Sequence, residues 1–146
     1  MKLKKAIVIP VVIILCVIVY ALAAPPMIAS GTWMLSYAMQ MEPCYIVAHN
    51  PGNEWTEQND PQFQLSKPID LVLEAADGKL QLTDKTNGVT YEGTYHATSL
   101  NTFVKQKYDL VIDGIEGTAS VSLAEGRTFL YINLPEHTLC FLMHEN

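Results

Sequence analysis

The chain has 146 residues, 49% of them hydrophobic, and its fifteen acidic and nine basic side chains give a formal net charge of −6 at pH 7. Lys2, Lys4 and Lys5 precede the first hydrophobic run, so the remainder of the chain is more acidic than this total. Nucleic acids and anionic lipids are bound through clusters of lysine and arginine, and this charge balance argues against both.

The N-terminal segment joins these lysines to an uncharged, almost wholly apolar run from Ala6 to Ala24. Ala21-Leu22-Ala23 has the small-x-small pattern of a signal peptidase site, which makes residues 1–24 a signal peptide. The alternative is an uncleaved membrane anchor, because the length of the run approaches the roughly 20 residues that span a bilayer. Under both interpretations the chain after Pro25 lies outside the cytoplasm. We therefore expect a secreted protein, or one anchored by a hydrophobic helix to the outer face of the cytoplasmic membrane.

A short linker, residues 25–30, leads into one expected domain from Gly31 to Asn146, made of short alternating runs separated by turn residues. Asp77-Gly78, between two such runs, is a strong hairpin signal. An antiparallel meander buries its apolar side chains by closing, so we expect an all-β, up-and-down barrel of eight or nine strands. The expected strands are Gly31–Gln40, Cys44–Asn50, Ile69–Ala75, Lys79–Asp84, Val89–Ala97, Thr102–Asp113, Glu116–Ala124, Arg127–Leu134 and His137–His144.

Strict alternation also predicts which side chains face the barrel interior. In the first strand it places Trp33, Leu35, Tyr37 and Met39 inside. An eight-stranded barrel is just wide enough to be filled by side chains or to hold one small ligand, and both outcomes stay open. If there is a cavity, its expected ligand-binding residues are the large aromatic ones of the inward set: Trp33, Tyr37, Tyr91, Tyr95, Tyr108 and Phe141.

One segment interrupts the strand pattern. Pro51–Pro68 is a long polar connection with two isolated aromatic residues, Trp55 and Phe63. Long irregular loops in compact domains are often lids or binding loops. We interpret Trp55 and Phe63 as residues of a possible lid.

The expected export determines how the cysteines are interpreted. Cys16 lies in the N-terminal segment, which leaves Cys44 and Cys140 in the outer domain. In an oxidising compartment such a pair predicts a disulfide, and the alternative is two unpaired buried thiols.

Signals for catalysis and for metal binding are weak. The four histidines lie on separate expected strands without ligand spacing, and the serines occupy no nucleophile-elbow context. We predict no catalytic residue, no metal site and no cofactor.

The stretch Gly31-Thr32-Trp33 resembles the G-x-W of lipocalins. It is followed by a turn of the DGK type, Asp77-Gly78-Lys79, and by a G-x-Y strand, Gly93-Thr94-Tyr95, an order that is similar to small exported bacterial lipocalin-like (calycin) domains. The resemblance covers Gly31 to about His144. It implies that Trp33 packs across the closed end of the barrel, beneath a cavity, and that the protein holds a small hydrophobic molecule.

These observations favour an extracytoplasmic binding module. Its partner is expected to be a small apolar or amphipathic ligand in the barrel, or an envelope protein contacted through Pro51–Pro68. The alternative is a structural or inhibitory interaction protein with a filled barrel and no ligand. The membrane is a partner only if the N-terminal segment stays uncleaved, and the sequence predicts no oligomeric state.

Overall fold

The computed structural model describes residues 10–19, 26–52, 65–98, 101–102 and 105–144. Residues 10–19 form a helix whose side chains are exposed, in agreement with the expected N-terminal hydrophobic helix. Among the residues described, no helix has both the length and the apolar character needed to cross a membrane.

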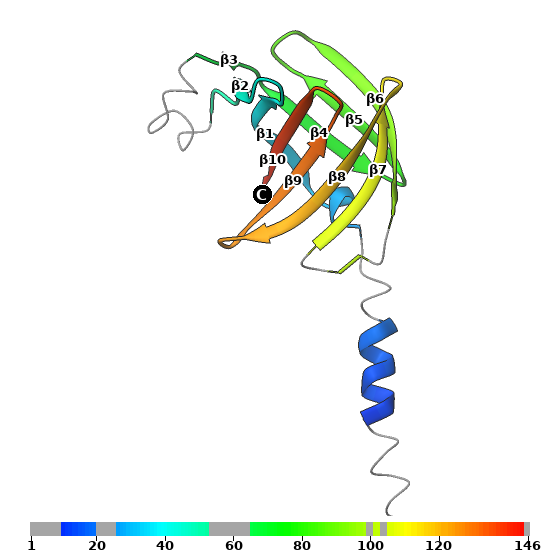
Figure 1. Cartoon of the computed structure of the whole chain (residues 1–146). Coiled ribbons are helices and arrows are strands. Elements are labelled where there is room, and N and C mark those ends of the chain that lie inside the picture. The colour runs from blue at the N-terminus through cyan, green and yellow to red at the C-terminus, as the bar shows by residue number, and fades with distance from the viewer. Residues whose placement is uncertain (1–9, 20–25, 53–64, 99–100, 103–104, 145–146) are drawn as a thin grey trace, which may run out of the picture.

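The domain is a closed antiparallel barrel (Figure 1). Its eight strands are β1 (Thr32–Gln40), β4 (Leu71–Ala76), β5 (Lys79–Asp84), β6 (Val89–Ala97), β7 (Lys105–Ile112), β8 (Ile115–Ala124), β9 (Arg127–Asn133) and β10 (His137–His144). Pairing of β10 with β1 closes the sheet. Two further strands, β2 (Tyr45–His49) and β3 (Lys67–Pro68), extend the sheet. β2 pairs with the C-terminal half of β1, and β3 runs parallel to β2. The predicted all-β, up-and-down barrel is confirmed.

Tight turns make the meander possible. Asp77-Gly78, Asp113-Gly114 and Glu125-Gly126 each have positive φ at both residues, as two-residue hairpins of type I′ require. This turn matches the right-handed twist of the strands that it joins. The hairpin predicted at Asp77-Gly78 therefore forms as expected.

The core is one cluster of buried side chains inside the barrel. It contains Trp33 and Leu35 of β1, Leu130 and Ile132 of β9, and Phe141 of β10, among others. A short 3-10 turn, η1 (Met27–Ala29), packs its Ile28 side chain into the same cluster. Because the Ile28 carbonyl accepts a hydrogen bond from the Trp33 indole, η1 lies at the end of the barrel at which Trp33 lies.

The first strand does not alternate strictly. The register with β10 shifts between Leu35, which pairs with Phe141, and Tyr37, which pairs with Cys140. The extra residue, Ser36, forms a β-bulge and reverses the alternation beyond it. Tyr37 and Met39 consequently face outward, and their predicted inward positions were wrong.

The hairpin of β5 and β6 extends beyond its neighbour. β6 pairs with β7 only from Gly93 onward, so Val89 and Tyr91 lie past the end of β7. Tyr91 has the predicted inward parity, since it pairs with the buried Leu82, yet it is 37% exposed. At Gly93 the two strands approach so closely that a Cβ atom would lie 2.1 Å from the carbonyl oxygen of Val111.

Candidate functional site

Four of the six aromatic residues predicted to bind a ligand come together inside the barrel. Trp33, Tyr108 and Phe141 are fully buried, and Tyr95 is buried against Tyr108. The two tyrosine rings meet edge to face, with centroids 5.7 Å apart and planes at 82°. Sequence reasoning thus identified most of the aromatic core.

A hydrogen-bond network closes the η1 end of this core. The indole Nε1 of Trp33 donates to the carbonyl oxygen of Ile28 at 3.0 Å. The amide side chain of Gln106, which has no exposed surface, accepts a bond from the backbone N–H of Met27 at 2.6 Å and another from the Tyr108 hydroxyl. Burial raises the pKa of Tyr108 to about 12, so its hydroxyl stays protonated and able to donate. Trp33 therefore lies at the η1 end of the core, where its indole is hydrogen-bonded to the segment that precedes β1.

The interior above this network is occupied by side chains. A cavity large enough for a water molecule leaves accessible surface on the side chains that line it. Trp33, Phe141, Leu130 and Ile132 have none, and neither have Leu73 and Val121. These six side chains therefore leave no space for a water molecule or a ligand at the centre of the barrel.

The remaining predicted site residues lie elsewhere. Tyr37 faces outward beyond the Ser36 bulge, and Tyr91 projects past the end of β7, so neither lines the interior. Trp55 and Phe63, the residues of the possible lid, lie outside the described residues.

The predicted disulfide between Cys44 and Cys140 is not formed, because both thiols are free. Cys140 alternates with the inward-facing Leu139 and Phe141, so its side chain lies on the outer face of β10, in register with Tyr37 and Tyr131. Cys44 lies in the turn between β1 and β2, where it contacts Met39 instead. The two cysteines thus belong to different local contacts.

The outer side of β9, β10 and β1 carries three cross-strand rows of side chains, which we call the β9–β10–β1 face. None of its members is charged at neutral pH, and most are half-buried. The outer side of β6 and β7, in contrast, carries Glu92, His96, Lys107 and Asp109. The rows of the β9–β10–β1 face are Met34, Leu142 and Phe129; Tyr37, Cys140 and Tyr131; and Met39, Thr138 and Asn133.

The middle row is held by its own polar groups. The hydroxyls of Tyr37 and Tyr131 both bond to the Cys140 thiol. Burial raises the pKa of Cys140 to about 11 and raises the pKa of both tyrosines. All three groups are therefore protonated at neutral pH, and Cys140 has little thiolate with which to act as a nucleophile.

Aromatic stacking and a second polar pair extend this row on both sides. Phe129 and Tyr131 stack along β9, with centroids 6.2 Å apart and planes 19° from parallel. On β2, the buried His49 pairs with Tyr37, and its Nδ1 lies 2.6 Å from the Ser66 hydroxyl. Side chains of this face are thus fixed by neighbours.

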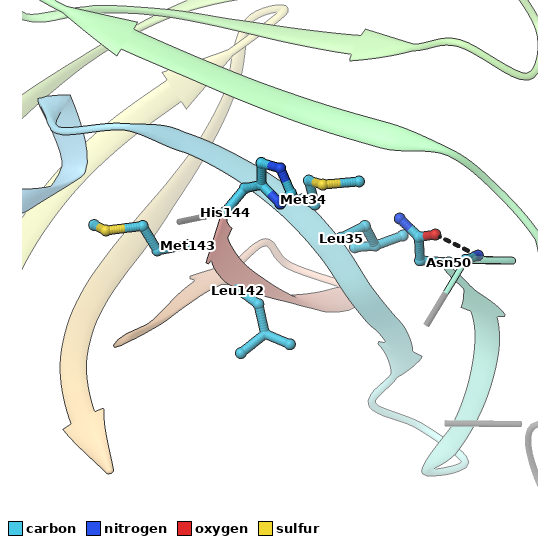
Figure 2. A pocket seen from close by; sticks show the side chains of 7 residues that line it. Met34, Leu35, Asn50, Leu142, Met143 and His144 are labelled. Atoms are coloured by element: carbon cyan, nitrogen blue, oxygen red, sulfur yellow. Dashed lines mark hydrogen bonds between the residues drawn. The ribbon is translucent and has the colours of Figure 1, made fainter. Parts of the chain in front are cut away.

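A pocket of about 250 Å³ lies at the end of the face that is formed by Met34 and Leu142 (Figure 2). Its walls come from β1, from β10 and from the segment after β2, where Asn50 Oδ1 accepts a bond from the N–H of Gly52 at 2.8 Å. The lining is mainly apolar and sulfur-containing: Met34, Leu35, Asn50, Gly52, Leu142, Met143 and His144.

Sequence reasoning missed this face because it placed Tyr37 inside the barrel. A signal was nevertheless present. The segments Thr32–Gln40, Thr128–Asn133 and Thr138–Leu142 contain no charged residue on either parity, whereas a strand with one solvated face normally alternates apolar with polar residues. Such a pattern indicates a strand whose outer side is also adapted to contact.

Within the described part of the chain, no three or more His, Cys, Asp or Glu side chains gather as metal ligands. Comparison of the chain with models of protein families, with curated proteins and with solved structures finds no match.

Proposed function

We propose that this chain is an extracytoplasmic, lipocalin-like interaction module that binds a protein partner through the β9–β10–β1 face. The observation that carries the proposal is the uncharged aromatic surface on the outside of a barrel whose interior is filled. Of the two functions considered from the sequence, this is the interaction protein without an internal ligand.

The filled interior supports this choice against an internal ligand. A small-molecule site needs a concave space of roughly 300–1,000 Å³. Residues at the centre of the barrel, such as Phe141 and Leu130, have no exposed surface on which a ligand would rest. A ligand inside would have to displace packed side chains.

The composition of the face supports a protein partner. Interface centres are enriched in tyrosine, phenylalanine and methionine and depleted of charged residues. Tyr37, Tyr131 and Phe129 supply large rings whose positions are fixed by the Cys140 bonds and by stacking. Such fixed aromatic side chains lose little conformational entropy on binding.

The net charge of the barrel domain indicates the chemistry of the partner. The described residues from 26 to 144 include eleven aspartate and glutamate residues against six lysine and arginine residues. A negative surface attracts positively charged proteins and raises their association rate. We therefore expect a partner with an apolar contact surface and a net positive charge.

The N-terminal segment supports the proposed location. Its lysines precede an apolar run, and the helix of residues 10–19 carries no charge. Whether cleaved or retained as an anchor, this segment delivers the barrel to the outside of the cytoplasmic membrane.

Site-specific photo-crosslinking in living cells tests the proposed face. A photoreactive phenylalanine analogue replaces Phe129 or Tyr131, and matched controls carry it at Thr94 or His96 on the outer side of β6. We expect one protein to crosslink from positions 129 and 131 and not from the controls. With that protein purified, Tyr131→Glu should weaken binding at least tenfold, whereas His96→Glu should change it less than twofold.

Two results would overturn the proposal. One is equal crosslinking from both sides of the barrel, which indicates contact without a specific face. The other is a small molecule that stays bound to the purified full chain when Tyr131 is replaced by Glu.

A further inference from the structure

Three sulfur-containing side chains lie close together at the edge of the barrel where β1 turns into β2. The Cys44 thiol lies 3.2 Å from the Met39 thioether and donates to it. The thioether of Met41 accepts a bond from the Thr138 hydroxyl at 3.3 Å, and Thr138 is the strand partner of Met39. Met39 and Met41 thus both lie next to Thr138, which brings the two thioethers and the Cys44 thiol to the same corner of the outer side of β1 and β10.

The turn that carries them is held in place by hydrogen bonds. The side chain of Gln40 donates to the carbonyl oxygen of Glu42 at 3.0 Å and accepts from the Tyr45 hydroxyl at 2.9 Å. The backbone N–H of Met41 donates to the carbonyl oxygen of Glu136 at 3.1 Å. These hydrogen bonds hold the backbone of the turn that carries Met41 and Cys44.

We propose that Cys44, Met39 and Met41 form a binding site for a soft monovalent metal ion, Cu(I) or Ag(I). Thiolate and thioether ligands select soft metals, whereas carboxylates and imidazoles suit harder ones. Here the donors are one thiol and two thioethers, and the Cys44 and Met41 side chains are exposed, which gives the ion a path from solvent.

Binding needs only an exchange of a proton for the metal ion. The S–H bond of Cys44 breaks and its proton passes to water, while the sulfur forms a bond to the metal. The thioether that accepts the S–H group, that of Met39, donates a lone pair to the ion. Oxidation states do not change, and one proton is released for each ion, so binding weakens as the pH falls.

A competition titration tests the site. The full chain carries Cys16→Ser, which removes the other exposed thiol, and is titrated with Cu(I) without oxygen against a chromophoric Cu(I) chelator. We expect one ion per chain, release of one proton per ion, and loss of this binding in Cys44→Ser. Met39→Leu and Met41→Leu, which keep the side-chain volume, should each weaken binding at least tenfold.

The matched control is Met27→Leu, a methionine of η1 that belongs neither to the cluster nor to the β9–β10–β1 face, and this variant should bind Cu(I) as tightly as the parent chain. Unchanged affinity in the double variant Met39→Leu/Met41→Leu would show binding by an isolated thiol and would overturn the proposal. So would retention of the ion by Cys44→Ser, or the absence of Cu(I) binding by a chain that circular dichroism shows to be folded.

Discussion

Truncation of Phe141 measures how well the barrel interior is filled. Its ring is fully buried in the middle of β10, between Leu35 of β1 and Leu130 of β9, both themselves buried. Phe141→Ala removes the ring from a site where the closed sheet holds the neighbours apart, so little collapse is expected. Substitutions of this kind cost about 3–5 kcal/mol, and we expect the upper half of that range.

This loss is a large part of the total free energy of unfolding of a small domain, about 5–15 kcal/mol. At roughly 4 °C per kcal/mol, the melting temperature should fall by about 15–20 °C. Urea unfolding followed by circular dichroism measures the change. The matched control is Val111→Ala on the outer side of β7, where the side chain is 37% exposed and the cost should stay below about 1 kcal/mol. A cost below about 1.5 kcal/mol for Phe141→Ala would mean a loosely filled interior and would refute the reasoning.

Three further predictions concern buried polar groups and thiols. Gln106→Leu leaves the Met27 N–H and the Tyr108 hydroxyl without their partner, so urea unfolding should show a loss of about 1–3 kcal/mol per group, partly restored by adding Tyr108→Phe. Folding raises the pKa of Cys140 to about 11 and of Tyr108 to about 12, so the folded state holds these protons more tightly. The contribution of these two groups to stability should be constant below about pH 9 and be lost between pH 9 and 12, and the loss below pH 11 should be smaller in Cys140→Ala. In the native full chain a thiol reagent should modify Cys44 and leave Cys140 unmodified until denaturant is added, and a need for prior reduction would show that a disulfide forms after all.

The strand order was predictable because the sequence marks its turns. Asp77-Gly78 joins two alternating runs, and only residues that tolerate positive φ suit such a turn. Hydrophobic alternation then placed Tyr95 of β6 and Tyr108 of β7 inside, where the structure has both buried. In these strands the turn residues and the alternation of apolar side chains indicate the same arrangement, so the predicted strand order and the predicted burial are both correct.

The location of the β9–β10–β1 face was not predictable by the same reasoning. The bulge at Ser36 adds one residue to β1 without a glycine or proline to mark it, so alternation placed Tyr37 on the wrong side. Tyr91 shows a second limit, since its parity was right but its exposure depends on where the neighbouring strand ends. Both errors concern how neighbouring strands pair, and the sequence of a single strand does not specify that pairing.

Native mass spectrometry of the purified full chain tests most directly whether the barrel is a filled scaffold that acts through its outer surface. The mass should equal that of the polypeptide, with no small molecule released on collisional activation, for the parent chain and for Tyr131→Glu alike. A stoichiometric small-molecule adduct retained by Tyr131→Glu would contradict the filled interior and restore the barrel as a ligand site.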